Sequence, residues 1–222
     1  MRQTAKTVAT LAMVAVTSWS SVAQAAFFSY SRALRYHVEQ INFVEPALAP
    51  MAHAMFCLRY RADCEVHGID FRKRNIALTV DRLNELNRVN RQINREIVPQ
   101  PNLGGLATED WIVAPVAGDC NDYAVTKRHK LLELGWPSRS LLLSEVVVPS
   151  GEHHLVLVVR VRDTDRMQDI DLVLDNLNYN LRPVGLTPYR WVRVESPSNP
   201  KYWSTVNVPS RLQTATAEPT EP

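Results

Sequence analysis

Positions 118–123 of this chain read Gly-Asp-Cys-Asn-Asp-Tyr, and this stretch does most to constrain the fold. Asp119 is a favourable N-cap residue, and Asp122 three positions later approximates a capping box with Asp in place of Glu. Apolar residues then recur at helical spacing, before a glycine that favours a left-handed C-terminal cap and a proline that prevents continuation: Ala124, Leu131, Leu134, Gly135 and Pro137. The pattern predicts a helix from about Cys120 to Leu134.

The predicted helix begins at Cys120, which makes this cysteine the leading candidate for a nucleophile. A thiol at a helix N-terminus experiences the positive end of the helix dipole, which favours the thiolate and is expected to lower the pKa of Cys120 below the free value of about 8.5. The alternative is a buried structural cysteine, because free cysteines are among the most buried residues.

The first 25 residues are typical of a secretory signal peptide. Arg2 and Lys6 precede the short apolar run 7–16, and Ala23-Gln24-Ala25 fits a cleavage site; an uncleaved membrane anchor is the alternative. We expect one domain over residues 26–208, because the mature chain has ordinary globular composition. Residues 209–222 are rich in Thr, Ala, Glu and Pro and are expected to form a disordered tail. The sequence thus predicts a periplasmic or secreted protein.

Charge gives no support for nucleic-acid binding. Removal of residues 1–25 takes away two basic residues and no acidic ones, which leaves 23 Lys and Arg against 23 Asp and Glu. No basic excess remains to attract phosphates. Two basic clusters, residues 72–74 and the pair Lys127-Arg128, are interpreted as solvated faces.

The mature chain contains an odd number of cysteines in a compartment that favours disulfides. Cys57 and Cys64 are separated by six residues, a loop that closes easily, so we expect them to pair and Cys120 to stay free. A second interpretation is a Cys₂His₂ zinc site that adds His53 and His67. The spacing between its cysteines is wider than the usual two to four residues.

The periodicity of the remaining chain predicts a helix followed by an antiparallel sheet. Apolar residues at helical spacing indicate a core helix over about 79–97, and a turn-rich loop containing Trp111 then leads to Cys120. Three β-rich runs separated by polar turns predict strands in hairpin succession; these cover residues 141–148, 153–161 and 170–174, with a further strand expected at 189–194.

Two of these strands carry residues that would complete a nucleophilic site. A catalytic cysteine needs an imidazole to accept its proton and a carboxylate or amide to orient that imidazole. His153 and His154 begin one strand, and Asp175 ends the next. Neighbouring strand residues point to opposite faces, so only one histidine can face Cys120. Alternation alone favours His153, whose face of the strand is the more apolar.

Several segments, taken together, closely resemble the bacterial transglutaminase-like cysteine proteinases. The resemblance covers roughly residues 57–203, and its motifs are Gly-Asp-Cys-x-Asp-Tyr-Ala from 118, Lys-Arg at 127, Leu-Leu-x-x-Gly from 131, His-x-Val-Leu from 154 and Leu-Asp-Asn-Leu from 174. It implies an α+β fold, the papain-like transglutaminase core, in which a Cys-bearing helix packs on an antiparallel sheet. It also implies a triad of Cys120, His154 and Asp175. His153 stands where the family commonly has Gly, so an exchange of roles between the two histidines stays open.

The resemblance further implies an exported cysteine endopeptidase that cleaves a surface or secreted protein such as an adhesin. Backbone N–H groups at the helix start, supported by Asp119 and Trp111, would stabilise the oxyanion. A membrane receptor is an implied regulatory partner. Relatives use calcium at acidic residues beside the cysteine; here Asp119 is retained but Asn121 replaces Glu, which weakens a site for a hard cation. No cofactor is therefore predicted, and calcium at these two residues stays open.

Two other functions use the same residues. Acyl transfer to an amine would make the protein a transglutaminase, because the triad is shared and the acceptor depends on the cleft. The third hypothesis is a catalytically idle module that binds peptides in the cleft.

Overall fold

The computed structural model describes residues 40–68, 75–102, 109–164 and 168–208. The predicted signal peptide, the tail and the basic residues 72–74 lie outside these ranges. Among the described residues, no helix has the length and apolar character needed to cross a membrane.

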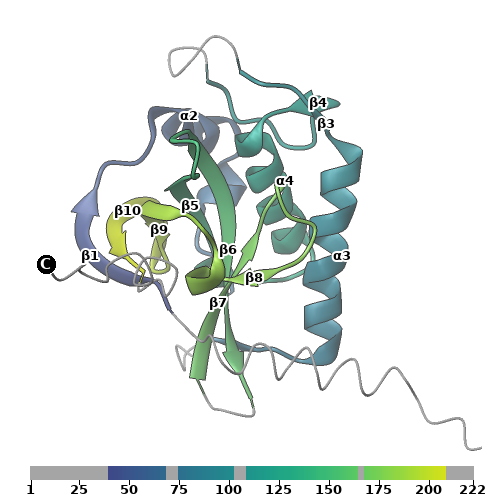
Figure 1. The fold of residues 1–222 in the computed structure, drawn as a ribbon, viewed down its shortest axis with the longest axis vertical. Coiled ribbons are helices and arrows are strands. Elements are labelled where there is room, and N and C mark those ends of the chain that lie inside the picture. The colour runs from purple at the N-terminus through teal and green to yellow at the C-terminus, as the bar shows by residue number, and fades with distance from the viewer. Residues whose placement is uncertain (1–39, 69–74, 103–108, 165–167, 209–222) are drawn as a thin grey trace, which may run out of the picture. The chain divides into compact units, whose positions relative to one another are not determined.

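The fold is built on one large sheet with the strand order β1-β10-β9-β5-β6-β7-β8 (Figure 1). Neighbours along this order are antiparallel, and the short strand β2 (Ile76–Ala77) adds parallel to β6. The central strands follow one another in the chain and confirm the three predicted runs: β5 (Leu141–Val147), β6 (His153–Asp163) and β7 (Gln168–Leu174). The two-residue strand β8 (Arg182–Pro183) closes one edge.

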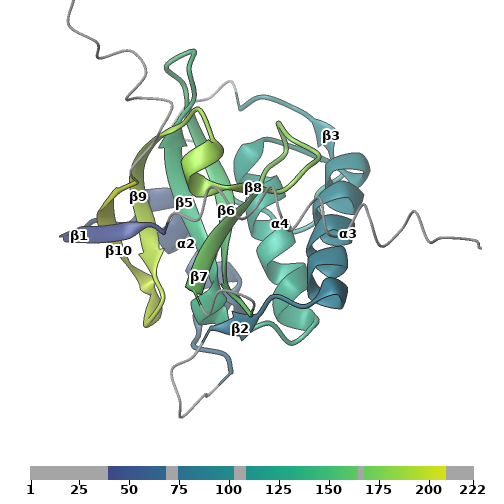
Figure 2. The ribbon, with the colours of Figure 1, turned by 60° about the horizontal axis from the view of Figure 1, so that its bottom comes forward.

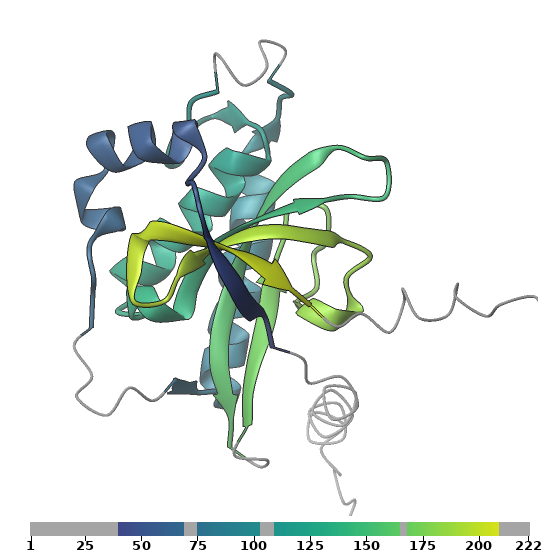
Figure 3. The ribbon, with the colours of Figure 1, turned by 90° about the vertical axis from the view of Figure 1, so that its left-hand side faces the viewer.

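The other edge contains two strands that the sequence did not indicate. The predicted strand near residue 189 is β9 (Arg190–Ser196), but β1 (Asn42–Ala47) and β10 (Asn199–Asn207) each contain a proline, which disfavours a strand prediction. Figure 3 shows β1 crossing the end of β10 at this edge. The register of β1 with β10 is irregular between Phe43 and Pro46, and that of β10 with β9 between Asn199 and Trp203, so each proline lies at a bulge or irregularity.

The described residues form three α-helices. The predicted core helix is α3 (Val80–Glu96), and the side chain of Thr79 accepts a hydrogen bond from the Arg82 N–H at its start. The predicted cysteine helix is α4 (Cys120–Glu133), which lies beside α3 and against β6 (Figure 2). A third helix, α2 (Met51–Arg59), is not predicted from the sequence, and only its last residues, from Cys57, overlap the predicted disulfide loop.

Residues on both faces of β6 are buried, which explains why alternation could not orient its histidines. One cluster of buried side chains includes Val156 and Val158 and continues into β5, β7 and β9, while Leu155, Leu157 and Val159 are also buried. The mixed architecture, with a Cys-bearing helix on an antiparallel sheet, confirms the predicted fold class.

The disulfide between Cys57 and Cys64 is present, as expected from their spacing. Its setting differs from the expected small loop over residues 57–70, because Cys57 lies in the last turns of α2 and Cys64 ends a 3₁₀ turn, Arg61–Cys64. The bridge therefore ties a helix to the turn that follows it. Cys120 is the free cysteine.

Candidate active site

The first turn of α4 holds Cys120 in a fully formed capping box. The Asp119 side chain accepts hydrogen bonds from the N–H groups of Asn121 and Asp122, and Asp122 returns a bond to the Asp119 N–H at 3.0 Å. This arrangement satisfies three backbone donors that a helix start would otherwise leave unpaired. The helix start predicted from the sequence is confirmed.

The same helix fixes the loop that precedes Cys120. The other oxygen of the Asp122 carboxylate accepts the Ile112 N–H at 2.8 Å, and the Thr126 hydroxyl accepts the Ala114 N–H at 2.8 Å. Ala114 has a φ of 51°, a strained value for a residue with a side chain. Because these bonds hold the strained turn, the loop and the nucleophile form one rigid unit.

The Cys120 thiol lies against β6, since the backbone of Leu155, the residue after His154, hydrogen-bonds to it. Burial is the largest of the effects that together raise the pKa of Cys120 to about 12; the charges of Asp119, Glu109 and Asp175 also raise it, and the Leu155 bond lowers it. The expectation of a lowered pKa is therefore wrong in direction. The loss of solvation outweighs the helix dipole.

His154 at the start of β6 and Asp175 after the end of β7 form a buried pair. Their side chains are 6% and 3% exposed, and His154 Nε2 lies 2.9 Å from Asp175 Oδ1. This contact leaves Nδ1 of the imidazole for another partner. His153 has a side chain that is 65% exposed and contacts Glu145 instead. The structure therefore places His154 with Asp175, and the alternation argument for His153 fails.

Further hydrogen bonds hold the Asp175 carboxylate as an anion. Tyr189 donates its hydroxyl, Leu177 its N–H at 3.0 Å and Asn178 its side-chain amide at 3.3 Å. Burial acts to raise the pKa of Asp175, but the bonds from His154, Tyr189 and Leu177 outweigh it and lower the pKa to about 2. The contact of Tyr189 with Asp175 is not predictable from sequence, because it depends on how residues 176–189 fold back.

Asparagines on α3 support the loop that begins at Asp175. Asn94 donates to the Asp175 carbonyl at 2.8 Å, and Asn90 donates to the carbonyls of Asn178 and Tyr179. The same helix adds a bond from Arg91 to the Asn180 side chain at 2.8 Å. Asn90 and Asn94, although asparagine has poor helix propensity, therefore help to position the loop that contains Asp175.

Trp111 is buried in the preceding loop, where its hydrogen bonding does not match the predicted oxyanion role. Its indole N–H donates to Glu109 Oε1 at 2.9 Å, and the same oxygen accepts from the Asn121 amide at 2.7 Å. The indole N–H is thus already engaged. Trp111 instead fixes Glu109 beside the first turn of α4, next to Asp119 and Asn121. Glu109 was not singled out in the sequence.

The interpretation of Lys127 and Arg128 as a solvated face is wrong. Their exposed fractions are 1% and 0%. Arg128 contacts Glu195 at 3.4 Å and donates to backbone carbonyls of Leu141 and Asp63, so it joins α4 to the sheet. Burial lowers the pKa of Lys127 to about 7, opposed by the Asp175 charge.

The alternative zinc site is not supported by the structure. His53, Cys57 and Cys64 do converge, with potential ligand atoms within 4.8 Å of one another. The two sulfurs are joined in the disulfide, however, and zinc binds thiolates. His53 is paired with Glu195 at 2.9 Å, and His67 contacts the Ala62 carbonyl instead.

Known proteins that are similar to this chain include solved structures and one protein family. No curated protein matches the chain. Solved structures of Legionella pneumophila LapG match this chain with 24% sequence identity. In one of them the match covers 50% of this chain and 62% of the LapG chain, with a TM-score of 0.42. In the calcium-bound form it covers 58% of this chain and 72% of the LapG chain, with a TM-score of 0.45. An EGTA-treated form also matches. The alignment thus spans less than two thirds of the first of these LapG chains. The model of the family described as bacterial transglutaminase-like cysteine proteinase matches residues 43–211, which is most of the sequence. This chain therefore belongs to the bacterial transglutaminase-like cysteine proteinase family.

Proposed function

We propose that this protein is an exported cysteine endopeptidase that uses Cys120, His154 and Asp175. The observation that carries the proposal is the buried pair of His154 and Asp175 at 2.9 Å, next to the strand residue whose backbone contacts the Cys120 thiol. A nucleophile, a base and a group that orients the base are the parts that acyl transfer requires. The N-terminal 25 residues motivate the exported location.

The reaction follows from the states of these groups. Because the resting thiol is protonated, its proton passes to His154 Nδ1 as sulfur attacks the peptide carbonyl. The imidazolium, stabilised by Asp175, then protonates the leaving amine, and a thioester to Cys120 remains. Water next attacks the thioester while His154 again takes a proton, which returns to the sulfur as the acid product leaves.

The proposed donor to the oxyanion is the backbone N–H of Cys120. The Asp119 side chain occupies the N–H groups of Asn121 and Asp122, whereas the described residues contain no hydrogen-bond acceptor for the Cys120 N–H. This group lies at the positive end of α4, where a developing negative charge is favoured.

Two adjacent histidines provide a matched test of this assignment. We expect Cys120→Ala and His154→Ala to abolish cleavage of a protein on the cell surface or in the medium, while His153→Ala retains it, because His153 faces solvent. Electrophoresis and mass spectrometry of both protein fractions would identify a polypeptide that stays full-length in the first two variants. Equal cleavage by wild type and Cys120→Ala would contradict the proposal, and incorporation of a labelled primary amine without fragments would indicate transamidation.

We also propose that calcium binds at the first turn of α4. Position 121, where the resemblance leads us to expect Glu, is Asn and provides no carboxylate. The carboxylate of Glu109 lies next to Asn121, because it accepts a hydrogen bond from the Asn121 amide at 2.7 Å. Glu109, Asp119 and Asn121 together offer the oxygen ligands that calcium prefers. A bound cation would offset the negative charges of Glu109 and Asp119, two of the carboxylates that raise the pKa of Cys120.

Calcium binding can be measured without activity. Titration calorimetry on the Cys120→Ala protein should show binding that Glu109→Gln and Asp119→Asn each weaken, whereas the surface substitution Glu152→Gln should not. Binding that is unaffected by Glu109→Gln would contradict the role of this residue.

A further inference from the structure

Helix α2 has an exposed side that is apolar except for Arg59 in its last turn. Its inner side is formed by Ala52, His53 and Phe56, all buried. The opposite side, here called the α2 face, consists of Met51, Ala54, Met55 and Leu58, which recur at the spacing of one helical stripe and are all exposed. Met51 is 77% exposed and Leu58 is 65% exposed. A surface helix usually turns its apolar stripe to the core and its polar residues to solvent, whereas the α2 face turns four apolar residues to solvent.

Exposed apolar side chains are concentrated around this helix. Of the fifteen large apolar side chains that are exposed among the described residues, seven lie between Phe43 and Val66. Leu48, just before α2, is 87% exposed. Scattered exposed apolar residues are ordinary, but a contiguous group marks a contact surface.

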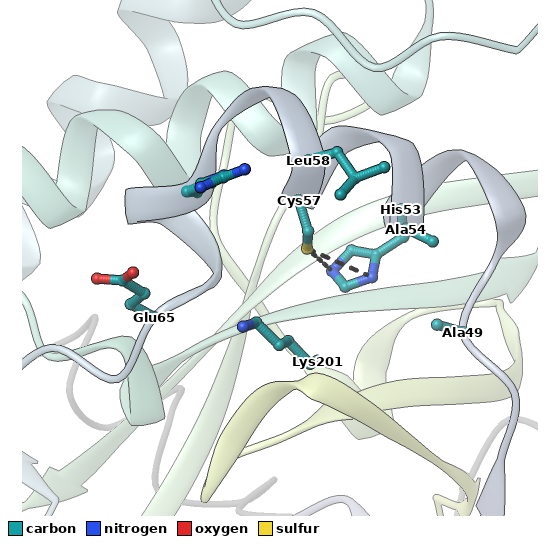
Figure 4. Close-up of a pocket in the computed structure, with 8 residues that line it drawn as sticks. Ala49, His53, Ala54, Cys57, Leu58, Glu65 and Lys201 are labelled. Atoms are coloured by element: carbon teal, nitrogen blue, oxygen red, sulfur yellow. Dashed lines mark hydrogen bonds between the residues drawn. The ribbon is translucent and has the colours of Figure 1, made fainter.

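A pocket of about 530 Å³ adjoins the α2 face. Ala49, Ala54 and Leu58 form its apolar lining, and the charged residues Arg61, Glu65 and Lys201 stand around it. Figure 4 shows Lys201 and Glu65 on the side of the pocket opposite to the helix. Within the described residues, neither cation has an ion-pair partner. The pocket thus combines an aliphatic lining with two cations and one carboxylate.

The inner wall of this pocket is linked to the catalytic helix. His53 lines the pocket, and its ring packs edge-on against Trp111 with 5.6 Å between centroids. Trp111 binds Glu109, which accepts the amide of Asn121 next to Cys120. The loop that leads to the nucleophile therefore also supports the pocket, so a polypeptide seated there would lie beside the active-site loop.

We propose that the α2 face and its pocket form an exosite for the protein substrate, which would bind through a segment in which an aliphatic side chain is flanked by carboxylates. The aliphatic group fills the pocket against Ala54 and Leu58, and the carboxylates approach Arg61 and Lys201. This proposal rests on the proposed peptidase function, but the binding itself does not require catalysis.

Binding is tested on the Cys120→Ala protein with two short capped peptides, one of alternating Leu and Glu and one of alternating Leu and Lys. We expect the Leu/Glu peptide to shift the NMR signals of α2 and Lys201 and to bind roughly fivefold more tightly than the Leu/Lys peptide. Met55→Glu and Lys201→Glu should weaken binding. The matched controls Val80→Glu and Arg88→Glu alter an exposed apolar residue and an exposed cation on α3 and should not. Equal binding of both peptides, or shifts elsewhere, would overturn the proposal.

The source of the segment is tested in cells. In cells, the polypeptide that stays uncleaved with Cys120→Ala should also stay uncleaved when the active enzyme carries Met55→Glu. The control Val80→Glu should cleave it normally. Normal cleavage by Met55→Glu despite lost peptide binding would overturn the exosite assignment in favour of another partner. Sedimentation that shows dimers dissociated by Met55→Glu would assign the α2 face to a second copy. If Cys120→Ala itself leaves cleavage unchanged, the peptidase function fails while the peptide-binding result stands.

Discussion

Gly118 lies directly against the carboxylate of Asp122. A Cβ atom built at Gly118 would be 2.2 Å from Asp122 Oδ2 and 2.8 Å from Asp122 Cβ. Asp122 cannot move away without losing its bonds to the N–H groups of Asp119 and Ile112. The glycine before the cysteine motif is therefore required by close packing at the helix start.

We expect Gly118→Ala to reduce the free energy of unfolding by about 2–3 kcal/mol, as overpacking of a rigid site does. Gly135→Ala is a suitable control, because Gly135 has a φ of 86° but nothing within 4 Å of an added Cβ. It should cost only about 1 kcal/mol, for its backbone conformation alone. Urea unfolding of both variants gives the two losses of unfolding free energy. If the loss for Gly118→Ala is equal to or smaller than that for Gly135→Ala, the capping box can adapt to the added methyl group.

The elements nearest the catalytic residues were predictable because local chemistry specifies them. The helix start at Cys120 follows from Asp119 and Asp122, and the helix at Val80–Glu96 from its cap and apolar spacing. The three central strands are runs rich in Leu, Ile and Val between polar turns. In each case, adjacent residues are sufficient to define the element.

Other features depend on contacts distant in sequence, and these were missed. Lys127 and Arg128 looked like surface charges, but Arg128 finds Glu195 in β9. The histidines could not be oriented by alternation, because both faces of β6 are covered. Tyr189 reaches Asp175 only after a long loop returns. Helix α2 was hidden by the flanking proline and by the apolar residues that it exposes.

The buried Asp175 should give the protein an acid-sensitive stability. Its pKa of about 2 is below the ordinary 3.8, so the folded state favours the anion and the stabilisation is complete above about pH 4. It is lost as the pH falls through about 2, and amounts to about 2.4 kcal/mol. Unfolding free energies measured between pH 6 and pH 2.5 should fall less for Asp175→Asn than for wild type. The same slope in both proteins would contradict this contribution.

Lys127 should destabilise the protein at neutral pH. Burial lowers the pKa of Lys127 from 10.5 to about 7. As the pH falls from about 10 to 7, Lys127 therefore binds a proton in the unfolded state but not in the folded state, and this favours unfolding. We expect Lys127→Met, which keeps the aliphatic volume, to raise the free energy of unfolding by up to about 4 kcal/mol at pH 7. The gain should shrink near pH 10. Urea unfolding at both pH values measures the difference, and a pH-independent effect would show that Lys127 is solvated.

The state of the Cys120 thiol distinguishes a base-activated nucleophile from a preformed thiolate. With a pKa near 12, set first by burial and then by Asp119, Glu109 and Asp175, the thiol should be protonated at neutral pH. Alkylation by iodoacetamide should therefore be slow at pH 7 and should still increase above pH 8.5, where a free thiol begins to level off.

A variant can locate the cause of this high pKa. Glu109→Gln removes one of the opposing carboxylates, so its alkylation rate at a given pH should exceed that of wild type, while Glu152→Gln, on the exposed β5–β6 turn, should match wild type. Mass spectrometry of the Cys120 peptide over pH 6–10 gives the rates. A plateau below pH 8.5 in wild type would instead demonstrate a thiolate stabilised by His154, and proton transfer would then precede substrate binding.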